Sequence, residues 1–326
     1  MTEPPPTGLD VAVLAGGLGT RSDGSVTTGD DGMVTSPKLS VLSTNRNMAH
    51  WLAETLDSIF RQSFTDFEAI MVDGASTDGS TAVLAAYPHL RWISEPDANA
   101  NEGFDKAITM ARGEYVTFCP VSDGYLSRNW FARAVAELDA DPTLSLVWGA
   151  DALMNQDGDL YGLVFPQFHR KPAPCGRDFL AYWLGTHLWF PEQNYVIRRS
   201  VLSRLWPSRD APSYFDHWNP FLRVILGFHT GGYLSKFLPI IPNWRRLHGD
   251  SVTEATKEHG LRTLSQYVDE IDAYGQALLA GRARHQFRAG DGSVIGDLGD
   301  QDLAALAERI EHWRSTHPVH GPRNLG

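Results

Sequence analysis

The chain has 326 residues with a formal net charge of −11, and 42% of its residues are hydrophobic. This length suits one large α/β domain or a domain and a half. The negative charge argues against non-specific nucleic-acid binding, so we expect no nucleic-acid partner. No apolar run reaches the roughly 18 residues that a spanning helix needs, which predicts a soluble protein. Two cysteines, Cys119 and Cys175, are too few for a disulfide framework or a cysteine metal site.

The N-terminal residues 1–36 are rich in Gly, Pro, Ser, Thr and Asp, a composition that predicts a flexible tail. The start has no basic region followed by an apolar core, so we expect no secretory signal and a cytoplasmic protein. Peripheral association with the inner face of the membrane stays open. Within the tail, Leu14-Ala-Gly-Gly-Leu-Gly-Thr-Arg21 resembles the phosphate loop of sugar nucleotidyltransferases, although a lone glycine-rich motif has low specificity.

From residue 38 the sequence predicts alternating strands and helices. In the first predicted helix, Leu52, Leu56 and Ile59 recur on one face at helical spacing. An alternating order of this kind calls for a parallel, doubly wound sheet with right-handed crossovers. The predicted strands are 38–44, 69–72, 91–94 and 115–119, and the predicted helices are 51–62, 81–87, 103–111 and 129–139.

The second of these strands stops on Asp73, directly before a turn that contains Gly74 and Gly79. An unbroken apolar run that ends in turn residues is typical of a strand buried on both faces. The residue at the carboxyl end of such a strand points into the crevice where open α/β sheets bind ligands. Asp73 therefore either serves a nucleotide-sized opening or caps the turn, and the residues alone leave both interpretations open.

The second half of the chain has a different spacing. Strands at 144–148 and 160–165 are predicted to pair through the turn Asn155-Gln-Asp-Gly158. Beyond Val252 we expect only helix, whose apolar positions suit packing on the domain, a dimer or a membrane surface. The other predicted elements are helices 179–184, 199–205, 219–226, 261–284 and 302–313, and a strand within 233–241.

Four segments carry a resemblance to a known family. They are Leu39-Ser-Val-Leu-Ser-Thr-Asn-Arg-Asn47 with the helix that follows it, Val72-Asp-Gly-Ala-Ser-Thr-Asp-Gly-Ser80, Ser94-Glu-Pro-Asp97 with Asp105-Lys106 and Gly113-Glu-Tyr115, and Arg246-Leu-His-Gly-Asp-Ser251. Each is weak by itself, but their order and spacing are specific when taken together. Residues 37 to about 255 resemble glycosyltransferase family 2, which has the GT-A nucleotide-sugar fold.

This resemblance implies a GT-A domain at 37–255. Its nucleotide-binding half would be residues 37–125 and its acceptor half residues 126–255. A helical extension would follow at 256–326, with a homodimer through its helices left open. The implied activity is inverting transfer of a sugar from a nucleotide-diphosphate donor to a hydroxyl of a glycan, a lipid-linked molecule or a small molecule. The donor-binding residues that it implies are Ser43, Thr44, Asn45, Asp73, Asp97, Lys106, Ser122, Asp123 and Arg246.

The turn Pro120-Val-Ser-Asp123 departs from the family pattern. The family normally has two or three acids there, the DXD motif, and their carboxylates hold Mg²⁺ or Mn²⁺ at the donor diphosphate. Only Asp123 remains in this chain. We expect a weakly held divalent metal with Asp123 and His248 as its ligands. The alternative is a metal-independent enzyme in which cationic side chains neutralise the diphosphate, the candidates being Arg198, Arg199, Arg245 and Arg246.

The acidic pair that supplies the base in this family is also altered. Inverting transfer needs a carboxylate that takes the proton of the acceptor hydroxyl. Here His217 and Asn219 stand at the usual acidic positions, and Asp216 lies one position away. We predict Asp216 as the base, with His217 second and Glu192 a lesser candidate. Asp216 would otherwise cap a helix. Two altered motifs keep open a chain that binds a nucleotide sugar without transferring it, and a nucleotidyltransferase that uses Gly16 to Arg21 is a further alternative.

Overall fold

The computed structural model describes residues 36–164, 174, 176–188, 190, 192–207, 220–249 and 257–316. For Val164, Glu192 and residues 257–263 it describes the backbone alone. The glycine-rich loop at Gly16 to Arg21 and the base candidates Asp216 and His217 lie outside these ranges.

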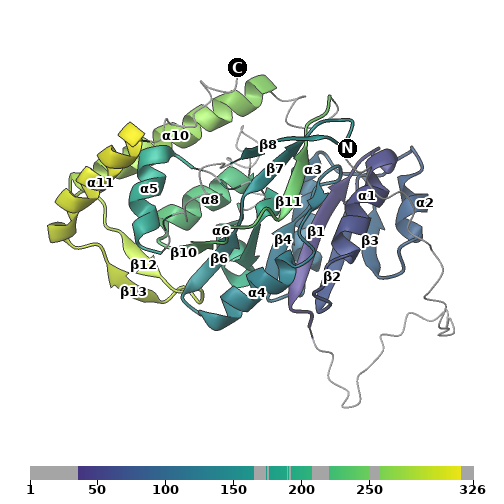
Figure 1. Ribbon diagram of the computed structural model, residues 1–326, viewed down its shortest axis with the longest axis horizontal. Coiled ribbons are helices and arrows are strands. Elements are labelled where there is room, and N and C mark those ends of the chain that lie inside the picture. Colours follow the sequence, from purple (N-terminus) through teal and green to yellow (C-terminus); the bar gives the residue numbers. More distant parts are fainter. Residues whose placement is uncertain are drawn as a thin grey trace, which may run out of the picture. The chain divides into compact units, whose positions relative to one another are not determined.

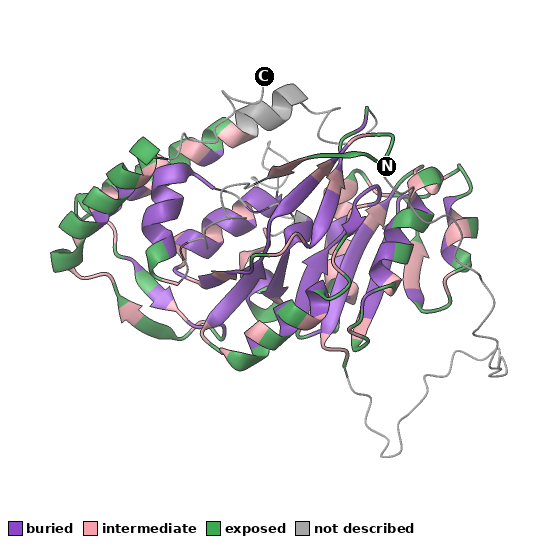
Figure 2. Ribbon diagram, in the orientation of Figure 1, coloured by how far each residue is buried: buried purple, intermediate pink, exposed green. Residues whose placement is uncertain are grey.

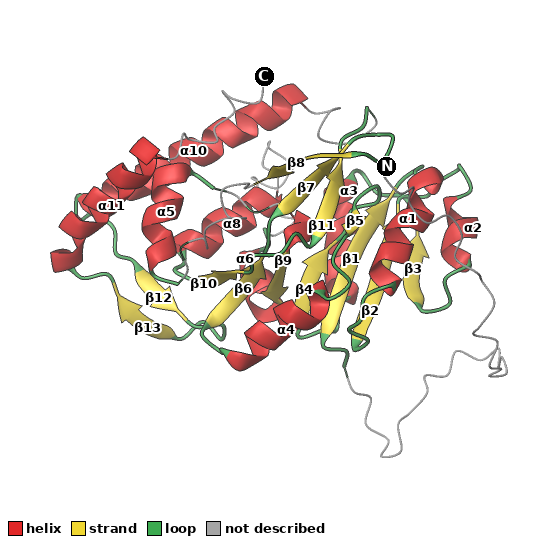
Figure 3. Ribbon diagram, in the orientation of Figure 1, coloured by secondary structure: helices red, strands yellow, loops and turns green. Residues whose placement is uncertain are grey.

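A seven-stranded sheet in the order β10-β6-β9-β4-β1-β2-β3 runs through the described fold (Figures 1 and 3). Strands β1, β2, β3 and β4 are parallel to one another, and β9 is antiparallel to both of its neighbours, β4 and β6. The predicted α/β class with a mostly parallel sheet is confirmed. The strands are β1 Leu39–Asn45, β2 Phe67–Asp73, β3 Leu90–Ser94, β4 Tyr115–Phe118, β6 Leu144–Trp148, β9 Tyr195–Arg198 and β10 Leu234–Phe237.

The chain changes direction within this sheet after β3. Strands β2 and β3 extend the sheet from one side of β1, whereas β4 pairs with the other side of β1. Right-handed crossovers then require α1 Ala49–Phe60 and α2 Ser80–Ala85 on one face, and α3 Ala100–Met110 on the opposite face. The point between β1 and β4 is the topological switch point, where open α/β sheets bind ligands.

Aromatic contacts show which helices cover each face. On one face, the ring of Phe67 in β2 packs against Phe60 of α1 and Phe131 of α4 Trp130–Ala140. On the other face, the ring of Phe118 in β4 packs against Phe104 of α3 and Phe221. Phe221 belongs to α8 Pro220–Thr230, which packs on α6 Arg199–Leu205. The central strands are therefore buried on both sides, as Figure 2 shows.

A second, four-stranded sheet in the order β5-β11-β7-β8 lies beside the switch point. It joins β5 Gly124–Tyr125, directly after Asp123, to β11 Asn243–Arg246, β7 Asp151–Met154 and β8 Leu160–Val164. The Trp244 indole crosses Gly124 so closely that a Cβ atom there would lie 2.3 Å from the ring. Glycine is therefore required at this crossing, which attaches β11 to the turn after β4.

The C-terminal region packs on α5 Asp178–Thr186, whose side chains are mostly buried. Helix α11 Leu303–Thr316 approaches α5 at Gly185, where an added Cβ would lie 2.7 Å from the Cβ of Trp313. Helix α10 Lys257–Leu279 contacts α5, α8 and α11. No helix in the described part of the chain combines the length and apolar character needed to cross a membrane.

Several predicted elements need correction. The partner of β8 in the hairpin is β7, not the predicted strand at 144–148, which is β6 of the seven-stranded sheet. Strands β9 and β11 were not predicted. The region beyond Val252 is not all helix, because β12 Gln286–Arg288 and β13 Val294–Asp297 form a hairpin around the segment Gly290 to Ser293. A short 3-10 turn, η3 Asp300–Asp302, leads from this hairpin into α11.

Candidate active site

The carboxyl ends of β1, β2 and β3 bring Asn45, Asp73 and Ser94 into register. The Asp73 side chain is fully buried. Its Oδ1 accepts hydrogen bonds from Asn45 Nδ2 at 2.6 Å and from the Ser76 hydroxyl, and its Oδ2 accepts from Ser94 Oγ at 2.7 Å and from the Ser76 amide at 2.9 Å. Asp73 thus joins three strand ends to the turn that follows β2.

Burial by itself raises the pKa of Asp73, but the hydrogen bonds from Ser76, Ser94 and Asn45 together outweigh it and lower the pKa. The carboxyl group is therefore ionised at neutral pH. The geometry shows the turn-capping role that the sequence left open. The predicted role of Asp73 and Asn45 in donor binding stays a prediction.

The turn after β2 also organises the start of α1. The Asp78 carboxylate accepts the Ala49 amide at 2.8 Å, so it caps a helix other than its own. Asn47, which has a left-handed backbone with φ 54°, accepts the Thr77 amide at 2.8 Å. Most polar residues of this motif therefore hold β1, α1 and the turn together at one edge of the sheet.

Asp97 lies against this edge between two glycines. An added Cβ at Gly74 would lie 2.8 Å from its carboxylate, and one at Gly103 would lie 3.4 Å from the same carboxylate and 2.9 Å from Thr44. Burial raises the pKa of Asp97, although the positive charges of Lys106 and Arg46 oppose that shift. These glycines thus leave room for an ionisable carboxyl group beside the end of β1.

Two other predicted donor-binding residues, Lys106 and Ser43, flank this point. Lys106 of α3 donates to the Pro96 carbonyl at 2.9 Å and pairs with Glu95 at 3.0 Å. Ser43 is buried within β1, two residues before Asn45. Lys106 thus holds the loop after β3, and the diphosphate contact predicted for it stays a prediction.

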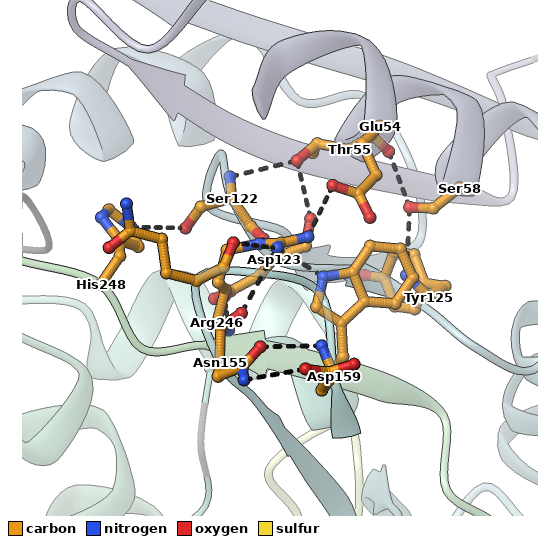
Figure 4. A network of polar contacts seen from close by, with 12 residues as sticks. Glu54, Thr55, Ser58, Ser122, Asp123, Tyr125, Asn155, Asp159, Arg246 and His248 are labelled. Atoms are coloured by element: carbon orange, nitrogen blue, oxygen red, sulfur yellow. Dashed lines mark hydrogen bonds and ion pairs between the residues drawn. The ribbon is translucent and has the colours of Figure 1, made fainter. Parts of the chain in front are cut away.

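The turn after β4 places Ser122 in a left-handed conformation, with φ 87°. This region is sparsely populated for residues other than glycine and persists only where the surroundings fix it. The Ser122 amide donates to Thr55 Oγ1 at 3.2 Å, and its carbonyl accepts from Trp244 Nε1 and Arg246 Nε, both at 3.2 Å. Thr55 also donates to the Asp123 carbonyl at 2.7 Å, so α1 and β11 hold this turn from two sides (Figure 4).

Asp123 is buried, and its two carboxylate oxygens have different partners. Oδ2 accepts from Gln193 Nε2 at 2.9 Å, and Oδ1 accepts from the Arg246 amide at 2.8 Å. Gln193 belongs to the 3-10 turn η2 Glu192–Asn194 directly before β9. The carboxylate that remains from the expected acidic motif is thus held at the switch point by residues from far along the chain.

The Arg246 guanidinium is buried and extensively bonded within the protein. Besides Ser122, it donates to Glu54 at 2.6 Å and to the Gln156 carbonyl at 3.2 Å, and it lies 4.1 Å from the centroid of the Trp51 ring. These contacts connect α1, the turn after β4 and the hairpin of β7 and β8. Contact with a diphosphate would require some of them to break.

The predicted metal ligands Asp123 and His248 both adjoin Ser122. His248 Nε2 lies 3.1 Å from Ser122 Oγ. Among the described residues, no three His, Cys, Asp or Glu side chains gather closely enough to hold a metal ion. The two candidate ligands therefore fit a divalent cation only where phosphate oxygens and water complete its coordination shell, an arrangement that Mg²⁺ accepts.

Two of the alternative cationic residues, Arg198 and Arg199, lie at the opposite edge of the sheet, and a third, Arg245, is already paired within the protein. Arg198 pairs with Tyr115 at the amino end of β4, the opposite edge from Asp123, and Arg199 follows it there. Arg199 donates to the Gly113 carbonyl at 2.6 Å. Arg245 pairs with the buried Asp151 at 3.3 Å. The proposal that Arg198 and Arg199 neutralise a diphosphate is therefore wrong.

The sequence did not identify Gln193, Thr55 or Glu54 as parts of the site. Gln193 directly follows the base candidate Glu192, but nothing in the local pattern shows that it reaches Asp123. Thr55 and Glu54 lie on a helix that was predicted only from its apolar face. Their polar contacts depend on which face of α1 meets the turn after β4.

A cavity of about 390 Å³ lies on the four-stranded sheet, away from Asp73 and Asp123. Leu126, Ala152, Leu160, Leu163 and Ile241 provide most of its lining, together with Ser127 and Gly162. Its apolar lining lacks the charged groups that a diphosphate needs. The polar cluster at the switch point, rather than this cavity, is the candidate active site.

Comparisons with known proteins agree with this geometry. Residues 40–205, about half of the chain, match the family model described as Glycosyl transferase family 2. A chondroitin synthase from Pasteurella multocida is 27% identical over 141 residues, which are 41% of this chain and 14% of that protein. An uncharacterised glycosyltransferase from Nostoc sp. is 22% identical over 254 residues, covering 72% of this chain and 75% of that protein.

Among solved structures, residues 1–349 of S. aureus TarS in complex with UDP-GlcNAc align with a TM-score of 0.54. The alignment covers 88% of this chain and 74% of that chain, at 15% identity. At this identity the likeness shows the fold alone, which is the GT-A fold that the sequence predicts.

Proposed function

Because the chain belongs to glycosyl transferase family 2, we propose that it transfers a sugar, with inversion, from a nucleotide-diphosphate donor to an acceptor hydroxyl. The relatives named above support sugar transfer, and the TarS complex shows that a protein of this fold holds UDP-GlcNAc. How this chain would bind its donor depends on its own side chains at the strand ends near the switch point.

The observation that carries the proposal is the common edge of Asp73 and Asp123. Strands β2 and β4 flank β1 on its two sides, so their carboxyl ends lie two strand spacings apart, about 10 Å. Both carboxylates are buried and fixed by hydrogen bonds on both oxygens. Acceptor groups fixed at a switch point match the way in which open α/β sheets bind nucleotides.

The donor's two ends would occupy different parts of this edge. Asp73 and Asp97 provide hydrogen-bond acceptors for base or ribose groups, and Lys106 stands beside them for negative charge. The turn at Ser122 and Asp123 would face the diphosphate. A divalent cation held there by Asp123 and His248 would neutralise the leaving diphosphate.

The transfer itself requires a base on the acceptor side. The acceptor oxygen forms a bond to the anomeric carbon while the bond from that carbon to the diphosphate breaks, and the carboxylate of Asp216 takes the hydroxyl proton. Attack from the face opposite the leaving group inverts the configuration. Asp216 follows from the family pattern alone, with His217 as the second candidate and Glu192 as the third.

The test starts with donor binding. Thermal-shift and calorimetric titrations with a panel of nucleotide sugars, with and without Mn²⁺, are expected to show one preferred donor. Asp216→Asn is then expected to keep the affinity for that donor and to lose transfer, since it removes only the base. Unchanged transfer in this variant would reject the assignment of Asp216.

One observation favours a second candidate function. Ser122 and Pro120 stand where the family has acids, and this weakens the metal site. A chain that binds the donor without transferring it is therefore the alternative. Donor binding by the wild-type chain without turnover, over glycan, lipid-linked and small-molecule acceptors, would support that alternative against the proposed enzyme.

A further inference from the structure

Gln193 is the side chain that connects the Asp123 carboxylate to the strand on the far side of β4. Its Nε2 donates to Asp123 Oδ2 at 2.9 Å, across 70 residues of sequence. Both side chains are buried, Gln193 to 1% exposure and Asp123 to 6%. We propose that Gln193 is a positioning residue, which fixes the orientation of the Asp123 carboxylate and thereby the donor-binding geometry of the site. The second part of this inference rests on the proposed function.

The orientation of the amide follows from the chemistry of its partner. An ionised carboxylate only accepts hydrogen bonds, so the NH₂ group of Gln193 must face it. A rotated amide would place Oε1 against Oδ2, and two acceptors would repel each other. In the present orientation Oε1 is buried, and it has no hydrogen-bond partner among the described residues. Gln193 therefore keeps its Oε1 buried without a hydrogen-bond partner among the described residues, while its Nε2 is bonded to Asp123.

The backbone directly after Gln193 is held by three hydrogen bonds. The Gly149 amide donates to the Asn194 carbonyl at 2.9 Å, and Asn194 Nδ2 donates back to the Gly149 carbonyl at 2.8 Å. One residue later, Thr117 of β4 donates to the Tyr195 carbonyl at 2.7 Å. Gln193 is thus fixed relative to β4, the strand that leads into Asp123.

The two donors on Asp123 act on different oxygens. The Arg246 amide reaches Oδ1 at 2.8 Å from β11, while Gln193 reaches Oδ2 from the turn before β9. A carboxylate held through both oxygens has a defined plane and cannot rotate freely about its last bond. Loss of the Gln193 donor would remove the hydrogen bond that holds Oδ2 at 2.9 Å, and with it one of the contacts that fix the carboxylate plane.

Two substitutions separate positioning from general support of the fold. Gln193→Leu replaces the amide donor by an apolar side chain of similar size. Gln193→Glu keeps the shape and replaces the NH₂ donor by a second acceptor facing Asp123, so the hydrogen bond that fixes the carboxylate is lost. Gln62→Leu is the matched control, because Gln62 is also buried and bonds through both ends of its amide, to Ser127 and Phe131, without contacting Asp123.

The first measurement needs no donor. The Arg246 backbone amide donates to Asp123 Oδ1, so its NMR chemical shift reports the orientation of this carboxylate. The shift is expected to move in Gln193→Leu and Gln193→Glu and to keep its wild-type value in Gln62→Leu. An unchanged Arg246 amide shift in Gln193→Glu would overturn the positioning role. Because the side chains of glutamine and glutamate have nearly the same shape, this variant remains informative even where Gln193→Leu does not fold.

The second measurement follows kcat and the donor KM. Gln193→Leu is expected to lose about 10-fold to 100-fold in kcat/KM, the usual range for a group that orients a ligand-binding side chain. Gln193→Glu is expected to lose at least as much, because it puts an acceptor of the same shape where the donor stood. A wild-type chain without any donor binding would reject the proposed function, and the NMR shift of the Arg246 amide would still decide the role of Gln193. Equal kcat/KM in Gln193→Leu and Gln62→Leu would overturn the link between this positioning and catalysis.

Discussion

The two buried aspartates of the candidate site, Asp73 and Asp123, are held in opposite ways. Asp73 is bonded by residues at most 28 positions away, all within the first part of the sheet. Asp123 is bonded by Gln193 and Arg246, which lie 70 and 123 positions away. The Asp73 site can therefore form with its own strands, whereas the Asp123 site is complete only when β9 and β11 have docked beside β4. A sequence motif reveals the first kind of site well and the second kind poorly.

The largest effect is expected for Asp123→Asn. The new NH₂ group would face a donor, either Gln193 Nε2 or the Arg246 amide, so one of the two hydrogen bonds becomes a repulsion. We expect transfer to fall about 100-fold, in the range found when a fixed electrostatic contact is removed from an active site. Steady-state kinetics with the preferred donor measures this change.

Asp269→Asn on the exposed surface of α10 is the control for this experiment, with no expected change. If Asp123→Asn retains full transfer, the difference between the two aspartates has no bearing on catalysis. The candidate active site would then have to be sought nearer to Asp73.

A smaller effect, on stability, is expected for Asp73→Asn. The asparagine NH₂ group would meet the donors Asn45, Ser76 or Ser94, so the folded state should lose about 1–3 kcal/mol. The folded-state pKa of Asp73 is lowered, so the wild-type carboxylate contributes stability above its unfolded pKa of about 3.9 and loses it as pH falls through the folded value. Urea unfolding of both proteins at neutral and acid pH tests this, and the difference between them should shrink in acid.

Asp297→Asn, at an exposed position in β13, controls for the loss of a charge. A stability loss in Asp73→Asn that persists unchanged at the lowest accessible pH would contradict this account. It would mean that the network depends on shape rather than on the ionised carboxylate.

The sequence predicted strands β1, β2 and β4 because each contains apolar residues that the sheet buries on both sides. It predicted β3, which is mostly half-buried, from its place in the alternating order of strands and helices. It did not predict β11, Asn243-Trp-Arg-Arg246, because three of its four residues are polar and only its neighbours in the sheet make it a strand. It also missed β9, a short strand of four residues between two helices. The Gly290 to Ser293 segment was correctly predicted as a break, but its flanking residues pair as a hairpin rather than extending two helices.

The residues of the candidate site divide in the same way, into those that the sequence could place and those that only the fold brings together. Asp73 and Asn45 occupy neighbouring strand ends, so a motif and a strand order were enough to place them together. Ser94, the third residue of this network, was not predicted to belong to it. The partners of Asp123 depend on tertiary packing that no local pattern encodes. The predicted contact of Arg246 with a diphosphate rested on its charge, whereas the fold uses that charge to join Glu54, Trp51 and the Ser122 carbonyl.

The smallest predicted effect concerns the stability that the protein loses as pH falls. It separates the loss caused by protonation of Asp73 from the loss caused by two buried histidines, His229 and His285. Burial lowers the pKa of His229 to about 3, with His285 adding to the shift, and burial lowers the pKa of His285 to about 4. The folded state therefore keeps both imidazoles neutral, while the unfolded chain binds protons below about pH 6.5. Stability then falls as pH drops below about 6.5, well before Asp73 is protonated, by about 1 kcal/mol per histidine between pH 7 and 5.5.

His229→Phe isolates the contribution of this histidine, because its ring is stacked on Phe179 and tilted against Trp183, and its Nε2 has no hydrogen-bond partner among the described residues. A phenyl ring keeps the packing and removes the titration. We expect a shallower fall of the unfolding free energy between about pH 7 and 5.5, by about 1 kcal/mol, measured by urea unfolding. His312→Phe, at an exposed position on α11, should leave the slope as in the wild type. If His229→Phe has the wild-type slope, the loss of stability between about pH 7 and 5.5 must come from His285 or from the sheet edge where Asp73 and Asp123 lie. The contribution of His229 could then not be separated by pH from that of the candidate site.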